Sequence, residues 1–145
     1  MSSLPNELRK PVDRTRTPRC TLCAGLGLRR ARADRIESVF PDAYITAVNM
    51  AEVIVKLDRL GAPGMTFARD LVSAGLTVVP MCWTQTAHIT TVLALEDMMS
   101  TRRRLLLGDL CCLAYTIEQQ IQVWNADRAW ADLDVPANVL VIRAD

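Results

Sequence analysis

The sequence predicts a three-layer α/β/α fold built around a mainly parallel β-sheet. Short runs rich in β-branched residues alternate along the 145 residues with segments whose apolar residues recur at helical spacing. The segments between these runs are long enough to hold helices, as connections between parallel strands require. Half of the residues are hydrophobic, so a chain of this length has enough apolar material for one compact domain.

The first clear strand and helix candidates lie between residues 43 and 81. A strand is predicted over residues 43–48, and the helix that follows it ends at Gly61 and Pro63. The apolar residues of this helix recur every three or four positions: Met50, Val53, Ile54, Leu57 and Leu60. A second helix over residues 65–74, closed by Gly75, leads to a β-branched strand over residues 76–81.

The second half of the chain repeats this alternation. A helix is predicted over residues 84–101, with inward-facing residues Ala87, Val92, Leu95 and Met98. Gly108 is expected to break the chain before a helix that starts at Asp109 and has one apolar stripe: Leu110, Leu113, Ala114 and Ile117. Strands over residues 121–124 and 139–142 complete the order, which predicts a sheet covered by helices on both faces.

Residues 1–33 predict an atypical, basic and irregular N-terminal arm, because prolines and arginines interrupt any period. The charge is divided unevenly along the chain. Residues 1–35 contain nine Lys or Arg against three acids (+6), and the remaining residues contain eight against thirteen (−5). A basic arm on an acidic body predicts either contact with nucleic acid or a poorly ordered leader.

Several classes of protein are disfavoured by composition. No apolar run reaches the length of a membrane span, and the first residues lack the hydrophobic segment of a secretory signal, so a cytoplasmic protein is predicted. Five cysteines are an odd number, which disfavours a closed disulfide framework. Cys20 and Cys23 have the spacing of a zinc knuckle, but no second pair matches it and His88 is the sole histidine.

Three acidic residues point to one site. Glu52 and Asp109 begin helices, and Asp127 follows a strand, so all three are expected at the carboxyl edge of the sheet, where such sheets bind ligands. Carboxylates that converge raise one another's pKa unless a cation lies among them. Oxygen ligands favour Mg²⁺, and hydrolysis of a phosphodiester is the chemistry that such a centre serves.

Each acid also has a purely structural explanation. Asn49 is a plausible N-cap, with Glu52 three residues later as in a capping box. Asp109 lies in a first helical turn, where a carboxylate caps the helix or complements its dipole. A similar choice applies to the arginines: Arg102, Arg103 and Arg104, like Arg128, are interpreted either as a solvated face or as contacts to RNA phosphates.

Three motifs resemble the PIN-domain family, most closely the VapC-type toxins of bacterial type II toxin–antitoxin pairs. The motifs are residues 45–53, Leu107-Gly108-Asp109 and residues 124–130, and they follow in the right order over residues 34–145. The resemblance implies a PIN-like domain with Mg²⁺- or Mn²⁺-dependent endoribonuclease activity on RNA, a cognate antitoxin that blocks the site, and a homodimer. It makes Glu52, Asp109 and Asp127 the catalytic and metal-binding acids, with Asp132 as an optional fourth.

The N-terminus departs from the family pattern. The family's first strand ends in an aspartate that binds the metal, and counting back from Glu52 reaches Arg19, a cation. The chain as written is therefore expected to lack the first strand and the first acid, which would weaken Mg²⁺ binding. One hypothesis is that residues before about Ala33 are read from a shifted frame or a displaced start.

Two alternatives stay open at this point. An inactive PIN relative could still bind its antitoxin and act as an interaction module, which Arg19 in place of an aspartate favours. A nucleotide- or phosphate-binding α/β domain is the other. It is disfavoured because the pair Gly25 and Gly27 lacks the third glycine of a phosphate-binding loop and a preceding strand.

Overall fold

The computed structural model describes residues 20–22, 40–97, 105–125, 130 and 138–141. In this part of the chain five strands form one sheet in the order β3-β2-β1-β4-β5, and every neighbouring pair is parallel. The strands are β1 (Cys20–Leu22), β2 (Ala43–Thr46), β3 (Thr77–Val79), β4 (Gln122–Asn125) and β5 (Asn138–Val141). The helices are η2 (Phe40–Asp42), α2 (Ala47–Arg59), α3 (Gly64–Ser73), α4 (Trp83–Asp97) and α5 (Leu107–Gln119).

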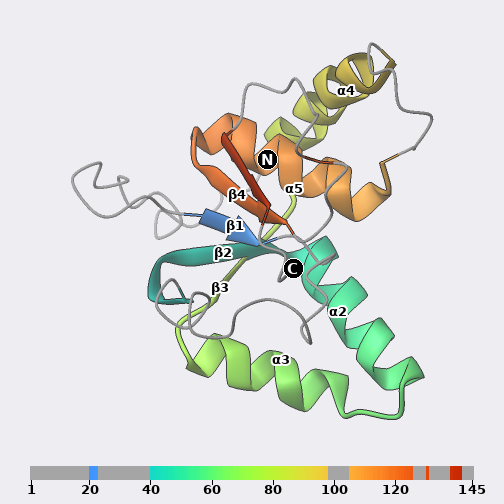
Figure 1. Cartoon of the computed structure of the whole chain (residues 1–145), viewed down its shortest axis with the longest axis vertical. Coiled ribbons are helices and arrows are strands. Elements are labelled where there is room, and N and C mark those ends of the chain that lie inside the picture. Colours follow the sequence, from blue (N-terminus) through green and yellow to red (C-terminus); the bar gives the residue numbers. More distant parts are fainter. Residues whose placement is uncertain (1–19, 23–39, 98–104, 126–129, 131–137, 142–145) are drawn as a thin grey trace, which may run out of the picture.

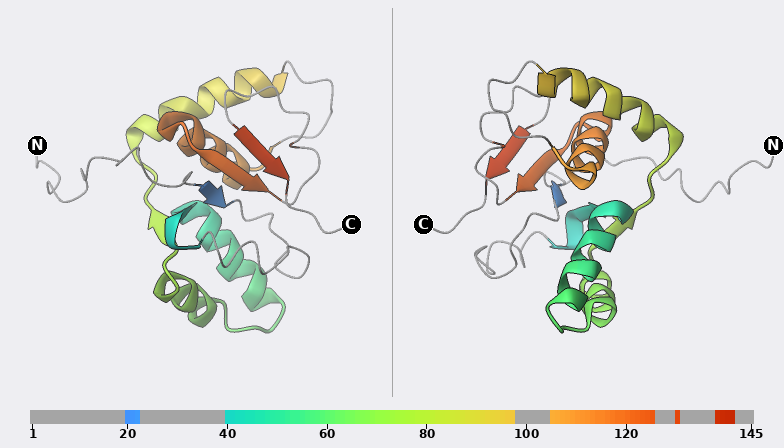
Figure 2. Two further views of the ribbon diagram at one scale, coloured as in Figure 1. Left: turned by 60° about the vertical axis from the view of Figure 1, so that its left-hand side comes forward. Right: turned by 90° about the vertical axis from the view of Figure 1, so that its right-hand side faces the viewer.

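Two helical layers enclose the sheet. Successive residues of β2 alternate between them: Ala43 and Ile45 belong to a core with α2 and α3, whereas Tyr44 contacts Tyr115 of α5, with ring centroids 6.1 Å apart. A second core joins Val123 of β4 to α4 and α5. Figures 1 and 2 show the pair α4 and α5 lying opposite the pair α2 and α3. The predicted three-layer α/β/α fold with a parallel sheet is confirmed.

The expectation that the first strand is missing is wrong. β1 lies in the middle of the sheet, where Cys20 pairs with Ala43 on one side and with Gln122 on the other. Periodicity could not reveal this strand, because three residues are too short for a pattern and the two flanking strands define its conformation. Part of the predicted irregular arm therefore belongs to the sheet.

The glycine signals located the ends of the helices correctly. α2 ends before Gly61 and α3 before Gly75, and both glycines have positive φ.

The inward face of α4 was predicted less well: Val92 is fully buried as expected, but Ala87 is exposed and Gln85 is buried instead. Leu60 is also exposed, because it caps α2 rather than facing the core. Met98 and the side chain of Leu95 lie outside the described part of the chain.

The start of α2 corrects another expectation. Thr46, not Asn49, is the N-cap: its backbone is extended, and its hydroxyl oxygen accepts a hydrogen bond of 3.1 Å from the Asn49 N–H. The strand therefore ends at Thr46, two residues earlier than predicted. Thr46 is fully buried, so this capping bond is shielded from water.

No helix in the described residues is long and apolar enough to cross a membrane.

Replacing Thr46 by alanine is expected to lower the free energy of unfolding by about 0.5–2 kcal/mol, because the first turn of α2 loses its cap. Thr91→Ala, at an exposed position of α4, is the matched control and should change stability by less than about 0.5 kcal/mol. Chemical denaturation measures both. Equal effects of the two substitutions would contradict the capping role.

Candidate functional site

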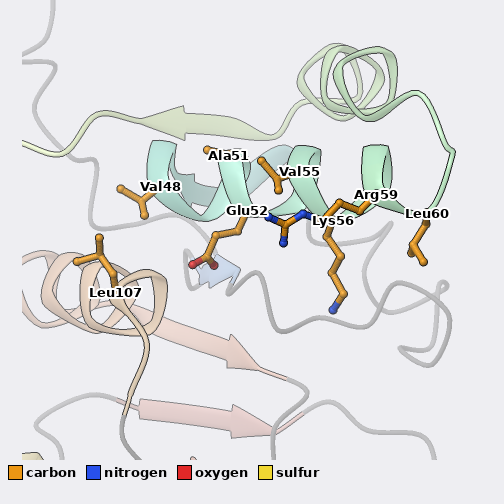
Figure 3. A pocket seen from close by; sticks show the side chains of 8 residues that line it. All are labelled: Val48, Ala51, Glu52, Val55, Lys56, Arg59, Leu60 and Leu107. Atoms are coloured by element: carbon orange, nitrogen blue, oxygen red, sulfur yellow. The ribbon is translucent and has the colours of Figure 1, made fainter.

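The candidate site lies where α2 passes the beginning of α5. Thr46 carries the chain from the end of β2 directly into α2, so this helix starts at the carboxyl edge of the sheet. Figure 3 shows Glu52 extending from α2 toward the side on which α5 begins at Leu107. The structure thus brings Glu52 and Asp109 together from two helices that are far apart in the sequence.

Gly108 lies directly against the Glu52 carboxyl group. A Cβ atom built on Gly108 would lie 2.6 Å from Cδ of Glu52 and would overlap both carboxylate oxygens. The Gly108 N–H also donates a hydrogen bond to this carboxylate. Gly108 is the second residue of α5, whereas the sequence predicted a break before the helix at this position.

The electrostatics of the pair follow from this packing. Glu52 is exposed as a whole residue, but the loss of hydration around its carboxyl group raises its pKa above the ordinary value, and the negative charge of Asp109 raises this pKa further. The Gly108 hydrogen bond and the positive charge of Lys56 act in the opposite direction, but they are the smaller effects. Two acids thus lie close enough for one to hinder the ionisation of the other.

The structural explanation of Glu52 as a capping residue is wrong. α2 begins at Ala47, so Asn49 occupies the third helical position and Glu52 the sixth, beyond the reach of the N-cap backbone. For Asp109 the capping explanation is partly correct: its Oδ2 accepts a hydrogen bond of 3.1 Å from the Leu106 N–H. This is half of a capping box, because the leucine side chain cannot accept the return bond.

The remaining predicted site residues lie outside the described part of the chain. They are Asp127, Asp132, Arg102, Arg103, Arg104, Arg128 and Arg19. Within the described residues no three His, Cys, Asp or Glu side chains gather in a way that could hold a metal ion. The described site therefore consists of two acids, with β4 ending at the buried Asn125 two residues before Asp127.

The boundaries of β1 change the interpretation of the missing acid. Arg19 precedes the strand, whereas ligands of a parallel sheet bind beyond the carboxyl ends of its strands. The position that follows β1 in the sequence is Cys23. The strand itself, Cys20-Thr21-Leu22, contains no carboxylate.

A groove of about 670 Å³ adjoins Glu52 along α2 and reaches Leu107 at the start of α5. Its apolar lining comes from Val48, Ala51, Val55, Leu60 and Leu107, and its other charged residues are Lys56 and Arg59. Glu52, Lys56 and Arg59 are spaced i, i+4 and i+7, so they follow one another along one face of the helix (Figure 3). Sequence reasoning missed Lys56 and Arg59, although their spacing from Glu52 is a usable signal.

The two cysteines of α5 lie in the interior of the fold. Cys111 and Cys112 are both buried, and burial raises the pKa of the Cys111 thiol, as do the neighbouring Cys112 and Glu52. A raised pKa keeps this thiol protonated, whereas nucleophilic and metal-binding cysteines are thiolates. The Cys20 and Cys23 pair that has the spacing of a zinc knuckle is not tested, because Cys23 lies outside the described part of the chain.

The structure resembles proteins of toxin–antitoxin complexes. A chain of VapBC2 from Rickettsia felis, bound to a DNA fragment from the promoter, matches with a TM-score of 0.64 at 10% identity, over 84% of this chain and 97% of that one. A toxin–antitoxin complex from Klebsiella pneumoniae gives 0.64 at 14% identity, over 87% and 99%. The chain shares its fold with these proteins.

VapBC-5 from Mycobacterium tuberculosis matches with a TM-score of 0.56 at 21% identity, over 88% of this chain and all of that one. No protein-family model and no curated protein matches the sequence. The similarity to VapBC-type proteins thus lies in the fold, which is the one that the PIN-domain motifs implied.

The raised pKa of Glu52 predicts a dependence of stability on pH. The folded chain binds the proton of the Glu52 carboxyl more tightly than the unfolded chain does. Ionised Glu52 therefore destabilises the fold once the pH rises above 4.5, the ordinary pKa of this carboxyl. Glu52→Gln, without metal, should therefore raise the melting temperature at pH 7.5 slightly, because Glu52 is exposed and solvent screens much of the repulsion. The gain should vanish near pH 4, where the wild-type carboxyl is itself protonated.

The control for this experiment is Asp70→Asn, which removes one charge from an exposed position of α3. It should not reproduce the stabilisation. A decrease in melting temperature for Glu52→Gln at pH 7.5 would contradict the assignment of Glu52 as a hindered carboxylate.

Proposed function

We propose that this chain is the toxin component of a type II toxin–antitoxin pair and acts as a Mg²⁺- or Mn²⁺-dependent endoribonuclease. The proposal rests on the proximity of Glu52 and Asp109. The Glu52 carboxyl group lies against Gly108, the residue that directly precedes Asp109. Two acids drawn together at a helix start, in a fold found in toxin–antitoxin complexes, support a metal centre better than two separate capping residues.

The donor set fits a hard divalent cation. Glu52 and Asp109 offer carboxylate oxygens, and a bound cation would relieve the repulsion that hinders ionisation of Glu52. In this proposal Asp127 adds a third carboxylate from the segment after β4. The metal, when bound, would polarise the phosphoryl group and activate a water molecule for hydrolysis. The Gly108 N–H donates to the Glu52 carboxylate, and Asp109 accepts a hydrogen bond from the Leu106 N–H at the start of α5.

Positive side chains around the acids would hold the RNA. Lys56 and Arg59 line the groove that contains Glu52, where they can offset the charge of backbone phosphates. In the same proposal Arg102, Arg103, Arg104 and Arg128 contribute further phosphate contacts. A cognate antitoxin that covers the apolar groove would exclude RNA from the acids, and a homodimer in the cytoplasm is the form that we propose for the active protein.

A second candidate function is that of an inactive relative which binds the antitoxin without cleaving RNA. The composition of β1 favours it, because the central strand supplies no acid to the carboxyl edge of the sheet. Cys23→Asp places a carboxylate directly after this strand. If the wild type does not cleave RNA and Cys23→Asp does, the wild type is an inactive relative. If the wild type already cleaves RNA, this second function is rejected.

The test is an RNA cleavage assay on the purified chain. A fluorescently labelled single-stranded RNA is incubated with Mg²⁺, with Mn²⁺ or with EDTA, beside DNA of the same sequence. Cleavage of the RNA but not of the DNA, in a reaction that EDTA abolishes, supports the proposed ribonuclease. Absence of cleavage with both metals would reject it, and Cys23→Asp in the same assay then decides whether the missing acid is the reason.

A further inference from the structure

Gly108 does not have the positive φ that usually explains a glycine at the end of a helix or in a turn, and that Gly61 and Gly75 have. It is the second residue of α5, and glycine is a poor helix former. Alanine would suit the backbone better. Some contact of this position must therefore require the absence of a side chain.

That contact is with the Glu52 carboxyl group. The three nearest atoms to a Cβ built on Gly108 are Cδ and the two oxygens of Glu52, and all of them are too close for a real methyl group. No backbone atom of another element is among them. The space that a side chain would fill at position 108 is occupied by the end of a side chain from α2.

The backbone of Gly108 adds a specific attraction. An N–H in the first turn of a helix has no partner inside the helix, so the Gly108 amide is available for an external acceptor. It donates to the Glu52 carboxylate, and a hydrogen bond to an ionised acceptor is roughly twice as strong as one between neutral groups. The missing Cβ and the available N–H thus act on the same carboxylate.

We infer that Gly108 is a positioning residue, whose N–H and lack of a side chain hold the Glu52 carboxylate beside Asp109. A carboxylate on a flexible side chain would otherwise move away from a like charge into solvent. The effect on metal affinity rests on the proposed function, but the position of Glu52 itself does not. The inference therefore has one readout that needs no metal.

The readout without metal is hydrogen exchange of the amide at position 108. In the metal-free wild type we expect slow exchange, because Glu52 accepts this hydrogen bond, and Glu52→Ala should accelerate it at least about 10-fold. Asp70→Asn, in α3, is the control and should leave it unchanged. An unchanged exchange rate in Glu52→Ala would overturn the inference whatever the chain does with metals.

The second readout is Mn²⁺ affinity in a double-mutant cycle. Gly108→Ala should weaken binding about 10–100-fold without lowering the melting temperature, because the flexible Glu52 side chain gives way rather than the helix. Glu52→Asp shortens the side chain by one methylene group and removes the overlap. Gly108→Ala should therefore cost far less affinity in the Glu52→Asp background than in the wild type.

Equal losses in both backgrounds would contradict the positioning role. If the wild type binds no Mn²⁺, the proposed metal function fails, and the amide exchange experiment alone decides the inference. If Gly108→Ala fails to fold, the overlap involves more than the Glu52 carboxylate, which also overturns it.

Discussion

Asp109→Asn is expected to reduce the proposed metal-dependent RNA cleavage at least about 100-fold while leaving the fold intact. Asparagine removes the charge that would bind the cation, but its oxygen can still accept the hydrogen bond from the Leu106 N–H. The cost in the free energy of unfolding should stay below about 1 kcal/mol, which is the usual value of one charge at a helix start. Initial cleavage rates and thermal unfolding measure the two effects.

Asp70→Asn makes the same chemical change in α3, at an exposed position outside the candidate site. It should retain the wild-type rate and the wild-type stability. Full activity of Asp109→Asn would show that the acid only caps α5. A large loss of stability in that variant would attribute any loss of activity to unfolding.

Trp130→Ala is expected to have the largest effect on stability. Trp130 is 2% exposed and belongs to the core that joins Val92, Leu113 and Val123. Truncating a buried aromatic residue leaves a cavity and typically costs about 3–5 kcal/mol. Because a domain is stable by only about 5–15 kcal/mol, the variant should unfold at markedly lower denaturant concentration.

Trp83→Ala is the matched control. Trp83 is 83% exposed at the start of α4, so its removal should change the free energy of unfolding by less than about 0.5 kcal/mol. Similar midpoints for the two tryptophan variants in urea would contradict the core described for α4, α5 and β4.

The fold could be predicted largely because its signals are local. Gly61 and Gly75 end α2 and α3, and Asp109 lies in the first turn of α5 as its position in the sequence indicated. β1 could not be predicted, because its three residues form a strand through pairing with β2 and β4 on either side. The choice between Thr46 and Asn49 as N-cap also depends on where β2 ends, which the sequence leaves ambiguous.

The candidate site was predicted in part for a different reason. Parallel topology brings strand ends and helix starts to one edge, so Glu52 and Asp109 could be expected there before any contact was known. The role of Gly108 could not, because it depends on an atomic contact with a residue of another helix. The start of α2 at Ala47 excludes the capping explanation of Glu52, which the sequence spacing had left open.

The central claim is that Glu52 and Asp109 form one cation-binding site. Calorimetric titration of Mn²⁺ into the purified wild-type chain, beside Glu52→Gln and Asp109→Asn, tests it most directly. We expect saturable binding to the wild type that each substitution weakens at least about 10-fold. Absence of binding to the wild type, or binding that neither substitution weakens, would contradict the claim.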